Sequence, residues 1–324
     1  MNHPVGIRRL SALIVSLLLV LMVLAGCGGK STDTRTAAAP GGGPAAAPAA
    51  RHTTYPVTVK DDEGNSITLK AQPKRVLSLA PSNSELVFAL GLGSSLVGRT
   101  DFDDYPAEVK SVPSIGSLFP PNYEKIVATQ PDLVLMIGGS KDVKEKLRQE
   151  YKLTVLTLQP SDFGGVYADL KLLGVALDAQ DKAEQIVSDM QQQVKSVTDA
   201  VAKATAKPSV AYVLDPQGPW VAGSGTFLDA IINMAGGTNA VADAKSFAEY
   251  KLELLAGKNP DMVVVSNQPA ADKLKADPNW QGFKALKEGK LLAVPDANLV
   301  DRPGPRLVDG LKWFARTLHP ELFK

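Results

Sequence analysis

The sequence predicts an α/β protein of two Rossmann-like lobes with mainly parallel sheets, joined by one long α-helix. Three observations lead to this fold class. Strand and helix signals alternate along the chain after about residue 54, which favours parallel sheets covered by helices. A stretch of about 27 residues, 180–206, contains no Pro and no Gly. A short motif occurs once on each side of that stretch. With 324 residues the chain is long enough for two domains.

The long helix is predicted from about Gln180 to about Ala206. Lys203 and Lys207 near its end suit the helix dipole, and Pro208 stops it. At about 1.5 Å per residue it would be about 40 Å long, more than one small lobe needs. We interpret it as a beam between two lobes, although this stretch alone also fits an ordinary surface helix. Its apolar residues recur at three- and four-residue steps and therefore share one face: Ala183, Ile186, Val187, Met190, Val194, Val197 and Val201.

The repeated motif is a Glu that opens a short apolar helix, followed seven residues later by Pro-Asp and an apolar strand. The first copy runs from Glu124 to Pro131-Asp132, and the second from Glu253 to Pro260-Asp261. A single match of this kind is weak proof of duplication, but it indicates two lobes built alike.

The N-terminus reads as an export signal. Arg8 and Arg9 precede an uncharged apolar run, 10–24, that is shorter than the ~20 residues a membrane-spanning helix needs. The run ends in Leu24-Ala-Gly-Cys27, which resembles the bacterial lipobox, in which the cysteine is lipidated. The segment 37–50 contains only Ala, Gly and Pro and cannot form a core. We therefore expect a lipoprotein signal peptide (1–26), a lipidated Cys27 with a flexible linker (27–53), and an extracytoplasmic protein held to the membrane by its lipid. The remaining boundaries are 54–178 for the first lobe, 179–207 for the interlobe helix and 208–324 for the second lobe.

Composition excludes several function classes. Lys+Arg 35 against Asp+Glu 34 gives a net charge of +1, so nucleic acid is not an expected partner. The single cysteine allows no intrachain disulfide. The three histidines are His3, His52 and His319, and two of them fall in the signal peptide and linker, so no histidine-rich metal site is expected.

In the first lobe, a hairpin is expected around the 62–65 turn, followed by a buried strand over 75–80. Ser82 and Glu85 fit a capping box for the next helix, and Gly91 fits its C-terminal cap; we prefer this structural reading to ligand contact. Further strands are expected at 96–98, 115–116, 133–137 and 154–158, and helices at 142–150 and 161–177.

In the second lobe, strands are expected at 209–214, 262–265 and 291–294, and helices at 227–234 and 270–275. Residues 220–225 read as an exposed turn. A final helix carries its apolar residues on one face: Leu307, Leu311, Phe314, Ala315 and Leu318.

The motifs together resemble the periplasmic cobalamin and ferric-siderophore binding proteins over about residues 55–324. The resemblance rests on the run from Arg75 to Gly91 and on Asp103-Asp-Tyr-Pro106, Asn122-Tyr-Glu124, Gln130-Pro-Asp-Leu-Val134, Gly236-Gly-Thr-Asn239 and Arg302-Pro-Gly-Pro-Arg306. It implies two lobes joined by one rigid helix, a ligand cleft between them and delivery to an ABC importer, with its permease and ATPase as partners. It also implies a monomer that carries no cofactor of its own and takes a small metal chelate as cargo.

The resemblance assigns candidate ligand contacts by motif. In the cobalamin receptors of this family, aromatic side chains from both lobes clasp the corrin, which is reasonable for a large, flat, mostly uncharged ligand. Leu118 and Met136 stand where a well-characterised member carries tryptophan, and the neighbouring Phe119 is a substitute. The alternative for the aromatic positions is core packing, although their turn-rich flanks favour exposure. The predicted ligand-binding set is Phe102, Leu118, Phe119, Met136, Trp220, Phe247, Asn298 and Arg302.

The two motif glutamates are assigned to permease docking. In the family one glutamate on each lobe pairs with arginines of the permease, and Glu124 and Glu253 occupy the matching positions. The structural alternative is a favourable charge at a helix N-terminus.

An enzyme is the main rival class. A lipid-anchored hydrolase would need a nucleophile and a base, but no Gly-x-Ser-x-Gly or His-Glu-x-x-His occurs, and His319 is the one histidine outside the N-terminal segment. Among binding proteins, cobalamin or a related corrinoid leads, and a ferric siderophore or haem is the alternative. An anionic iron chelate would call for convergent cations, for which Arg302, Arg99 and Arg306 are candidates.

Overall fold

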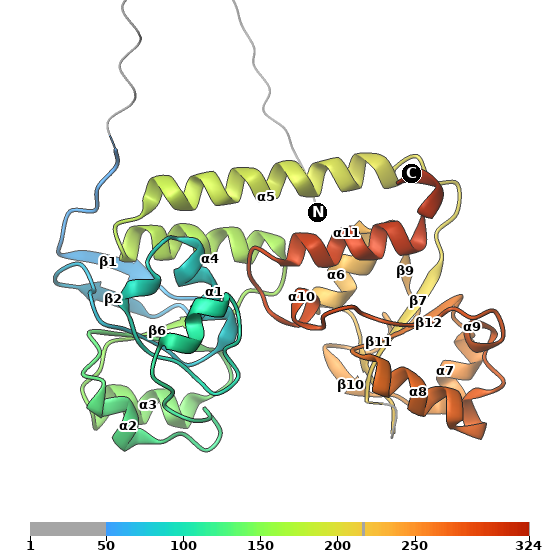
Figure 1. Cartoon of the computed structure of the whole chain (residues 1–324), viewed down its shortest axis with the longest axis horizontal. Coiled ribbons are helices and arrows are strands. Elements are labelled where there is room, and N and C mark those ends of the chain that lie inside the picture. Colours follow the sequence, from blue (N-terminus) through green and yellow to red (C-terminus); the bar gives the residue numbers. More distant parts are fainter. Residues whose placement is uncertain (1–49, 216–217, 324) are drawn as a thin grey trace, which may run out of the picture. The chain divides into compact units, whose positions relative to one another are not determined.

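The computed structural model describes residues 50–215 and 218–323, which belong to one compact unit, Ala49–Lys324 (Figure 1). The predicted signal peptide, Cys27 and most of the predicted linker lie outside the described residues. Within the described ranges, no helix combines the length and the hydrophobicity that crossing a membrane requires.

The first lobe is built on a parallel four-stranded sheet in the order β4-β3-β5-β6. Its strands are almost fully buried, because helices cover both faces of such a sheet. A hairpin of β1 (Val57–Lys60) and β2 (Ser66–Leu69) precedes it, as predicted. The remaining elements, in chain order, are β3 (Val76–Ser78), α1 (Pro81–Ala89), β4 (Leu96–Gly98), α2 (Tyr123–Ala128), β5 (Leu133–Ile137), α3 (Lys141–Gln149), β6 (Val155–Leu158) and α4 (Phe163–Ala176).

The long helix α5 spans Gln180–Val201, 22 residues, and leads from the first lobe to the second (Figure 1). Its predicted apolar face is confirmed, with Val187 and Met190 among its buried residues. It packs against α4 of the first lobe and α11 (Leu307–Leu318) of the second, and one hydrophobic core continues along it into both lobes. The helix ends earlier than predicted because residues 202–207 are exposed or only partly buried, so no packing extends it towards Pro208.

The second lobe has a mixed sheet in the order β10-β8-β7-β11-β12, with β9 beside β7. Strands β7, β11 and β12 are parallel as predicted, whereas β8 and β10 add an antiparallel edge. The predicted exposed turn at 220–225 is therefore wrong at its start, where Trp220 begins β8. The elements are β7 (Ser209–Asp215), β8 (Trp220–Ala222), α6 (Phe227–Met234), β9 (Thr238–Asn239), β10 (Phe247–Glu249), α7 (Leu252–Lys258), β11 (Met262–Val265), α8 (Gln268–Ala276), α9 (Lys284–Lys287), β12 (Leu291–Ala293), α10 (Asn298–Asp301) and α11.

The repeated motif has the same structure in both lobes. Helices α2 and α7 each end before a left-handed residue, Gln130 (φ 46°) and Asn259 (φ 44°), which directly precedes the proline. The aspartate after each proline then accepts hydrogen bonds from the start of the neighbouring strand segment. Asp132 accepts from the backbone amides of Lys74 and Arg75 at 2.9 and 3.0 Å, and Asp261 from the amide and hydroxyl of Ser209 at 2.9 Å.

The ends of α1 give one confirmed and one wrong prediction. Gly91 has φ +79°, and the amides of Gly91 and Leu92 bond back to Phe88 and Val87, which is a Schellman cap. At the other end, the helix begins at Pro81 and its N-cap, Ala80, makes no side-chain bond. The predicted capping box of Ser82 and Glu85 is absent, because the helix begins before Ser82 and Glu85 pairs with Arg302 and Arg306 of the second lobe.

Candidate ligand-binding site between the lobes

Two pockets are lined by residues from both lobes. The first, about 430 Å³, includes Phe88, Tyr105 and Glu108 from the first lobe and Pro305 and Arg306 from the second. The second, about 340 Å³, lies where β3, β5 and β6 end and includes Pro81, Ile137, Gln159 and, from the second lobe, Asp301 and Arg302. In parallel α/β sheets the carboxyl ends of the strands are where ligands bind. The pockets therefore mark the place between the lobes where a ligand site is expected.

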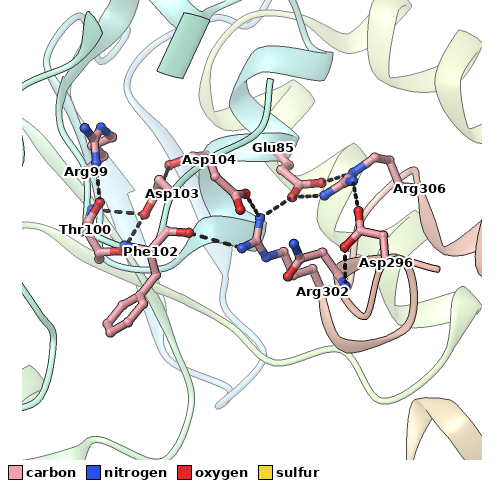
Figure 2. A network of polar contacts seen from close by, with 11 residues as sticks. Glu85, Arg99, Thr100, Phe102, Asp103, Asp104, Asp296, Arg302 and Arg306 are labelled. Atoms are coloured by element: carbon pink, nitrogen blue, oxygen red, sulfur yellow. Dashed lines mark hydrogen bonds and ion pairs between the residues drawn. The ribbon is translucent and has the colours of Figure 1, made fainter. Parts of the chain in front are cut away.

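A polar network joins the lobes beside these pockets (Figure 2). Arg306 holds both carboxylate oxygens of Glu85, with Nη2 at 2.7 Å and Nε at 2.9 Å, and its Nη1 lies 3.2 Å from Asp296. Arg302 donates to Glu85 at 3.1 Å, to Asp104, and to the carbonyl oxygen of Phe102 at 3.1 Å. Glu85 is thus shared by two arginines of the other lobe.

The network is largely removed from water. The side chain of Glu85 is 2% exposed, and those of Arg302 and Arg306 are 13% and 14% exposed. Burial acts to lower the pKa of both guanidinium groups, but their carboxylate partners more than offset this and raise each pKa above its usual range. The Arg306 guanidinium also lies 3.9 Å from the ring centre of Tyr105, a cation–π contact. Both arginines therefore remain charged while nearly dehydrated.

Hydrogen bonds to Asp103 hold the loop that carries Phe102 in place. This carboxylate is 3% exposed and accepts hydrogen bonds from the Ser84 hydroxyl on α1 and from the amide and hydroxyl of Thr100. Burial raises the pKa of Asp103, although these bonds and Arg99 oppose the shift. Asp103 therefore positions the loop, which leaves the neighbouring Phe102 ring to project away from the network (Figure 2).

Four of the predicted contacts are exposed aromatic side chains. Phe102 and Phe119 in the first lobe are 64% and 61% exposed, and Trp220 and Phe247 in the second are 46% and 47% exposed. Large aromatic side chains usually lie in the interior, so their exposure on both lobes is informative. The predicted exposure of Phe102, Trp220 and Phe247 is confirmed, and core packing is excluded for them.

The sheet places two of these aromatics together. In the antiparallel pair of β8 and β10, Trp220 lies opposite Glu249 and Phe247 lies opposite Ala222. Trp220 and Phe247 are therefore diagonal neighbours on one face of the sheet, at a separation that aromatic side chains span. The edge that sequence analysis did not foresee as strands thus builds the aromatic surface of the second lobe.

The other predicted contacts are less accessible. Leu118 and Met136 are 5% and 1% exposed and pack in a core with Leu77 and Ile126, so both are buried and do not face solvent. Asn298 begins α10 and is partly buried, and its backbone amide donates a hydrogen bond to the Asp296 carboxylate. Arg302 lies in the site but is occupied by Glu85 and Asp104.

The sequence did not assign Asp104 and Tyr105 to this site, and for Glu85 we preferred a capping role to ligand contact. Their partners lie about two hundred positions away, so no local pattern could pair them. One signal was available: Glu85 lies in the first turns of the helix that follows the buried strand β3, near the end of the sheet where ligand sites form.

The two motif glutamates lie at equivalent positions, second in α2 and second in α7. Both are exposed, and neither forms an ion pair with another described residue. Their helices lie in the half of Figure 1 away from α5. Each helix also exposes a large apolar side chain, Val127 and Leu254.

In the part of the chain that the structure describes, no group of three or more His, Cys, Asp or Glu side chains is arranged to hold a metal ion. The site combines exposed aromatic side chains on both lobes with a network in which two arginines pair with three carboxylates, and these features are those of a two-lobed α/β binding protein.

Comparison with known proteins agrees with this class. Residues 76–297 match the family described as periplasmic binding protein, and the chain belongs to that family. It is 31% identical to an uncharacterized ABC transporter substrate-binding lipoprotein, YvrC, of Bacillus subtilis (strain 168), over 98% of this chain and 99% of the relative. It is 29% identical to a cobalamin-binding protein of Halobacterium salinarum, over 88% and 81% of the two chains.

Solved structures share the two-lobed fold. A periplasmic heme binding protein from Pseudomonas aeruginosa superposes with a TM-score of 0.70 and 30% identity, over 76% of this chain and 93% of the other. The predicted family and fold class are confirmed. The protein is a substrate-binding component of the ABC transporter type.

Proposed function

We propose that the protein captures cobalamin or a related corrinoid between its lobes and delivers it to the permease of an ABC importer. The observation that carries this proposal is the set of exposed aromatic side chains on both lobes: Phe102, Phe119, Trp220 and Phe247. A large, flat chelate gains most from rigid aromatic faces that need little ordering on binding. The similarity to a cobalamin-binding protein adds support.

The protein acts in this proposal as a carrier and not as an enzyme. It works outside the cytoplasm, held to the membrane by a lipid on Cys27, with the permease and its ATPase as partners. The similarity to a substrate-binding lipoprotein over almost the whole chain supports this placement. A ferric siderophore or haem is the second candidate cargo, because a heme binding protein shares the fold at 30% identity.

Titration of the purified protein with cyanocobalamin, haemin and a ferric hydroxamate tests the cargo. We expect stoichiometric binding of cyanocobalamin without turnover. Trp220→Ala and Phe102→Ala should each weaken that binding about 10- to 100-fold, the range for a central aromatic anchor. Trp313→Phe on α11 is the control, since this side chain packs against Phe314 away from the proposed surface. Tight binding of haemin alone would contradict the corrinoid proposal and favour the second candidate.

Docking to the permease is assigned to Glu124 and Glu253, supported by their matching, exposed positions and by the apolar Val127 and Leu254 on the same helices. Charge reversal, Glu124→Arg or Glu253→Arg, should reduce uptake by cells at least about tenfold, because a close charge pair becomes a repulsion. Ligand affinity should not change.

The control for docking is Asp199→Arg, which reverses an exposed charge on α5. It should leave uptake intact. If a glutamate reversal weakened ligand affinity as much as uptake, the docking role would be refuted.

A further inference from the structure

The two arginines between the lobes are already occupied by carboxylates of the protein itself. Arg306 grips Glu85 through two hydrogen bonds and contacts Asp296, and Arg302 contacts Glu85 and Asp104. Two positive groups thus face three negative ones. Among the described residues that line the two interlobe pockets, Arg302 and Arg306 are the cations, whereas Glu85, Glu108 and Asp301 are acidic.

This arrangement disfavours a ligand that brings its own carboxylates. To reach either guanidinium, such a ligand would have to displace Glu85, whose side chain is 2% exposed and would be left buried without a partner. A buried charge that loses its partner costs several times what a surface pair contributes. A ligand whose polar groups are amides meets no such competition.

We infer that Glu85 is a specificity-determining residue, a resident carboxylate that keeps Arg302 and Arg306 from recognising anionic chelates. The cargo is then a metal chelate without peripheral carboxylates, such as a corrinoid with its amide side chains or an uncharged hydroxamate complex. Haem, with two propionates, belongs to the excluded class. This inference rests on the proposed function only in placing the cargo between the lobes.

The test compares cyanocobalamin and haemin as probes of wild type and Glu85→Gln, with the ratio of the two dissociation constants as readout. Glutamine keeps the shape of Glu85 and removes its charge. The ratio should shift about tenfold or more towards haemin, the scale of one charge-assisted hydrogen bond. Haemin affinity of the variant should also fall as salt rises, because released guanidinium groups now bind the propionates.

Two further variants separate charge from structure. In Glu85→Gln/Arg306→Gln the shift should be lost, because a cation that would hold the propionates is gone. Asp199→Asn removes the same charge from an exposed pair on α5 and should leave the ratio unchanged.

An equal loss of affinity for both probes in Glu85→Gln would overturn the inference, since Glu85 would then only hold the lobes together. A wild-type protein that binds haemin as tightly as the variant does would overturn it as well. Should Glu85→Gln not fold, Asp104→Asn decides: among the residues the structure describes, this half-exposed carboxylate pairs with Arg302 alone, and its removal should give a smaller shift in the same direction. No shift there would also sink the inference.

Failure of the proposed function gives a different result from failure of this inference. If the proposed function is wrong, the wild type binds no cyanocobalamin, yet the gain of haemin affinity in Glu85→Gln can still be measured on its own.

Discussion

Helices α4 and α11 hold matching positions in the two lobes but differ in the polarity of the side chains they bury. Both pack against α5. The buried residues of α11 are all apolar or glycine, whereas α4 buries Asp169, which is 0% exposed. Neither carboxylate oxygen of Asp169 has a hydrogen-bond partner among the described residues. Matching positions in the architecture therefore do not require matching polarity, and α4 carries a destabilising buried carboxyl group that α11 does not.

The destabilisation of the fold by the buried Asp169 depends on pH. Burial, together with the nearby Asp62 carboxylate, raises the pKa of Asp169 from 3.8 to about 8. Between these values the unfolded chain loses the proton while the folded chain keeps it. Asp169 therefore destabilises the fold increasingly as pH rises above about 4, and the effect levels off above about 8.

The largest effect is expected from Asp169→Asn, which tests the difference between α4 and α11. Asparagine resembles the protonated carboxyl in shape but does not ionise in the unfolded chain. We expect the free energy of unfolding to rise by about 2–4 kcal/mol at pH 7 and by much less at pH 5. Urea unfolding at a series of pH values measures it.

Asp309→Asn on α11 is the matched control for this change. Its carboxylate is exposed beside Lys312, so its replacement should have a small effect without the same rise with pH. A gain for Asp169→Asn that is constant from pH 5 to pH 8 would show that ionisation is not the cause.

The fold was predictable where a pattern is local and repeats. The apolar face of α5 follows from the three- and four-residue spacing of residues such as Val187 and Met190, and the alternation of strands and helices follows from composition along the chain. The end of α5 was not predictable, because it depends on where packing partners stop. Strands β8 and β10 were missed because three-residue strands at a sheet edge carry almost no periodic signal.

The exposed aromatic residues of the site were predictable because a local sequence pattern indicates them. Turn-rich flanks indicated that Phe102, Trp220 and Phe247 would be exposed. The ion pairs of Glu85 with Arg302 and Arg306 join positions 217 and 221 residues apart, and only the folded chain reveals them. Matching positions by motif assigned Leu118 and Met136 to the ligand surface, but it does not report burial, and both lie in the core.

A smaller effect tests whether the repeated Pro-Asp motif stabilises the two lobes equally. Asp132→Ala removes two hydrogen bonds to the chain ahead of β3, and Asp261→Ala removes two at the start of β7 together with the one from Lys284. If the motif does the same work in each lobe, each variant should lose a similar free energy of unfolding at pH 7, about 1–2 kcal/mol. Asp272→Ala, in an exposed helical contact with Gln268, is the control and should change little.

Acid should weaken the contribution of the Asp261 copy of the motif. The pKa of Asp261 is lowered to about 2, first by the Lys284 ammonium at 2.7 Å and then by Ser209. Because the folded pKa lies below the unfolded one, the contribution of Asp261 is present above about pH 4 and is lost as pH falls towards 2. About a third of its side chain is exposed, so screening keeps this contribution near 1 kcal/mol. The loss in Asp261→Ala should therefore shrink between pH 5 and pH 3. A loss that stays constant over this range would mean that packing, and not the charged hydrogen bonds, is what the aspartate contributes.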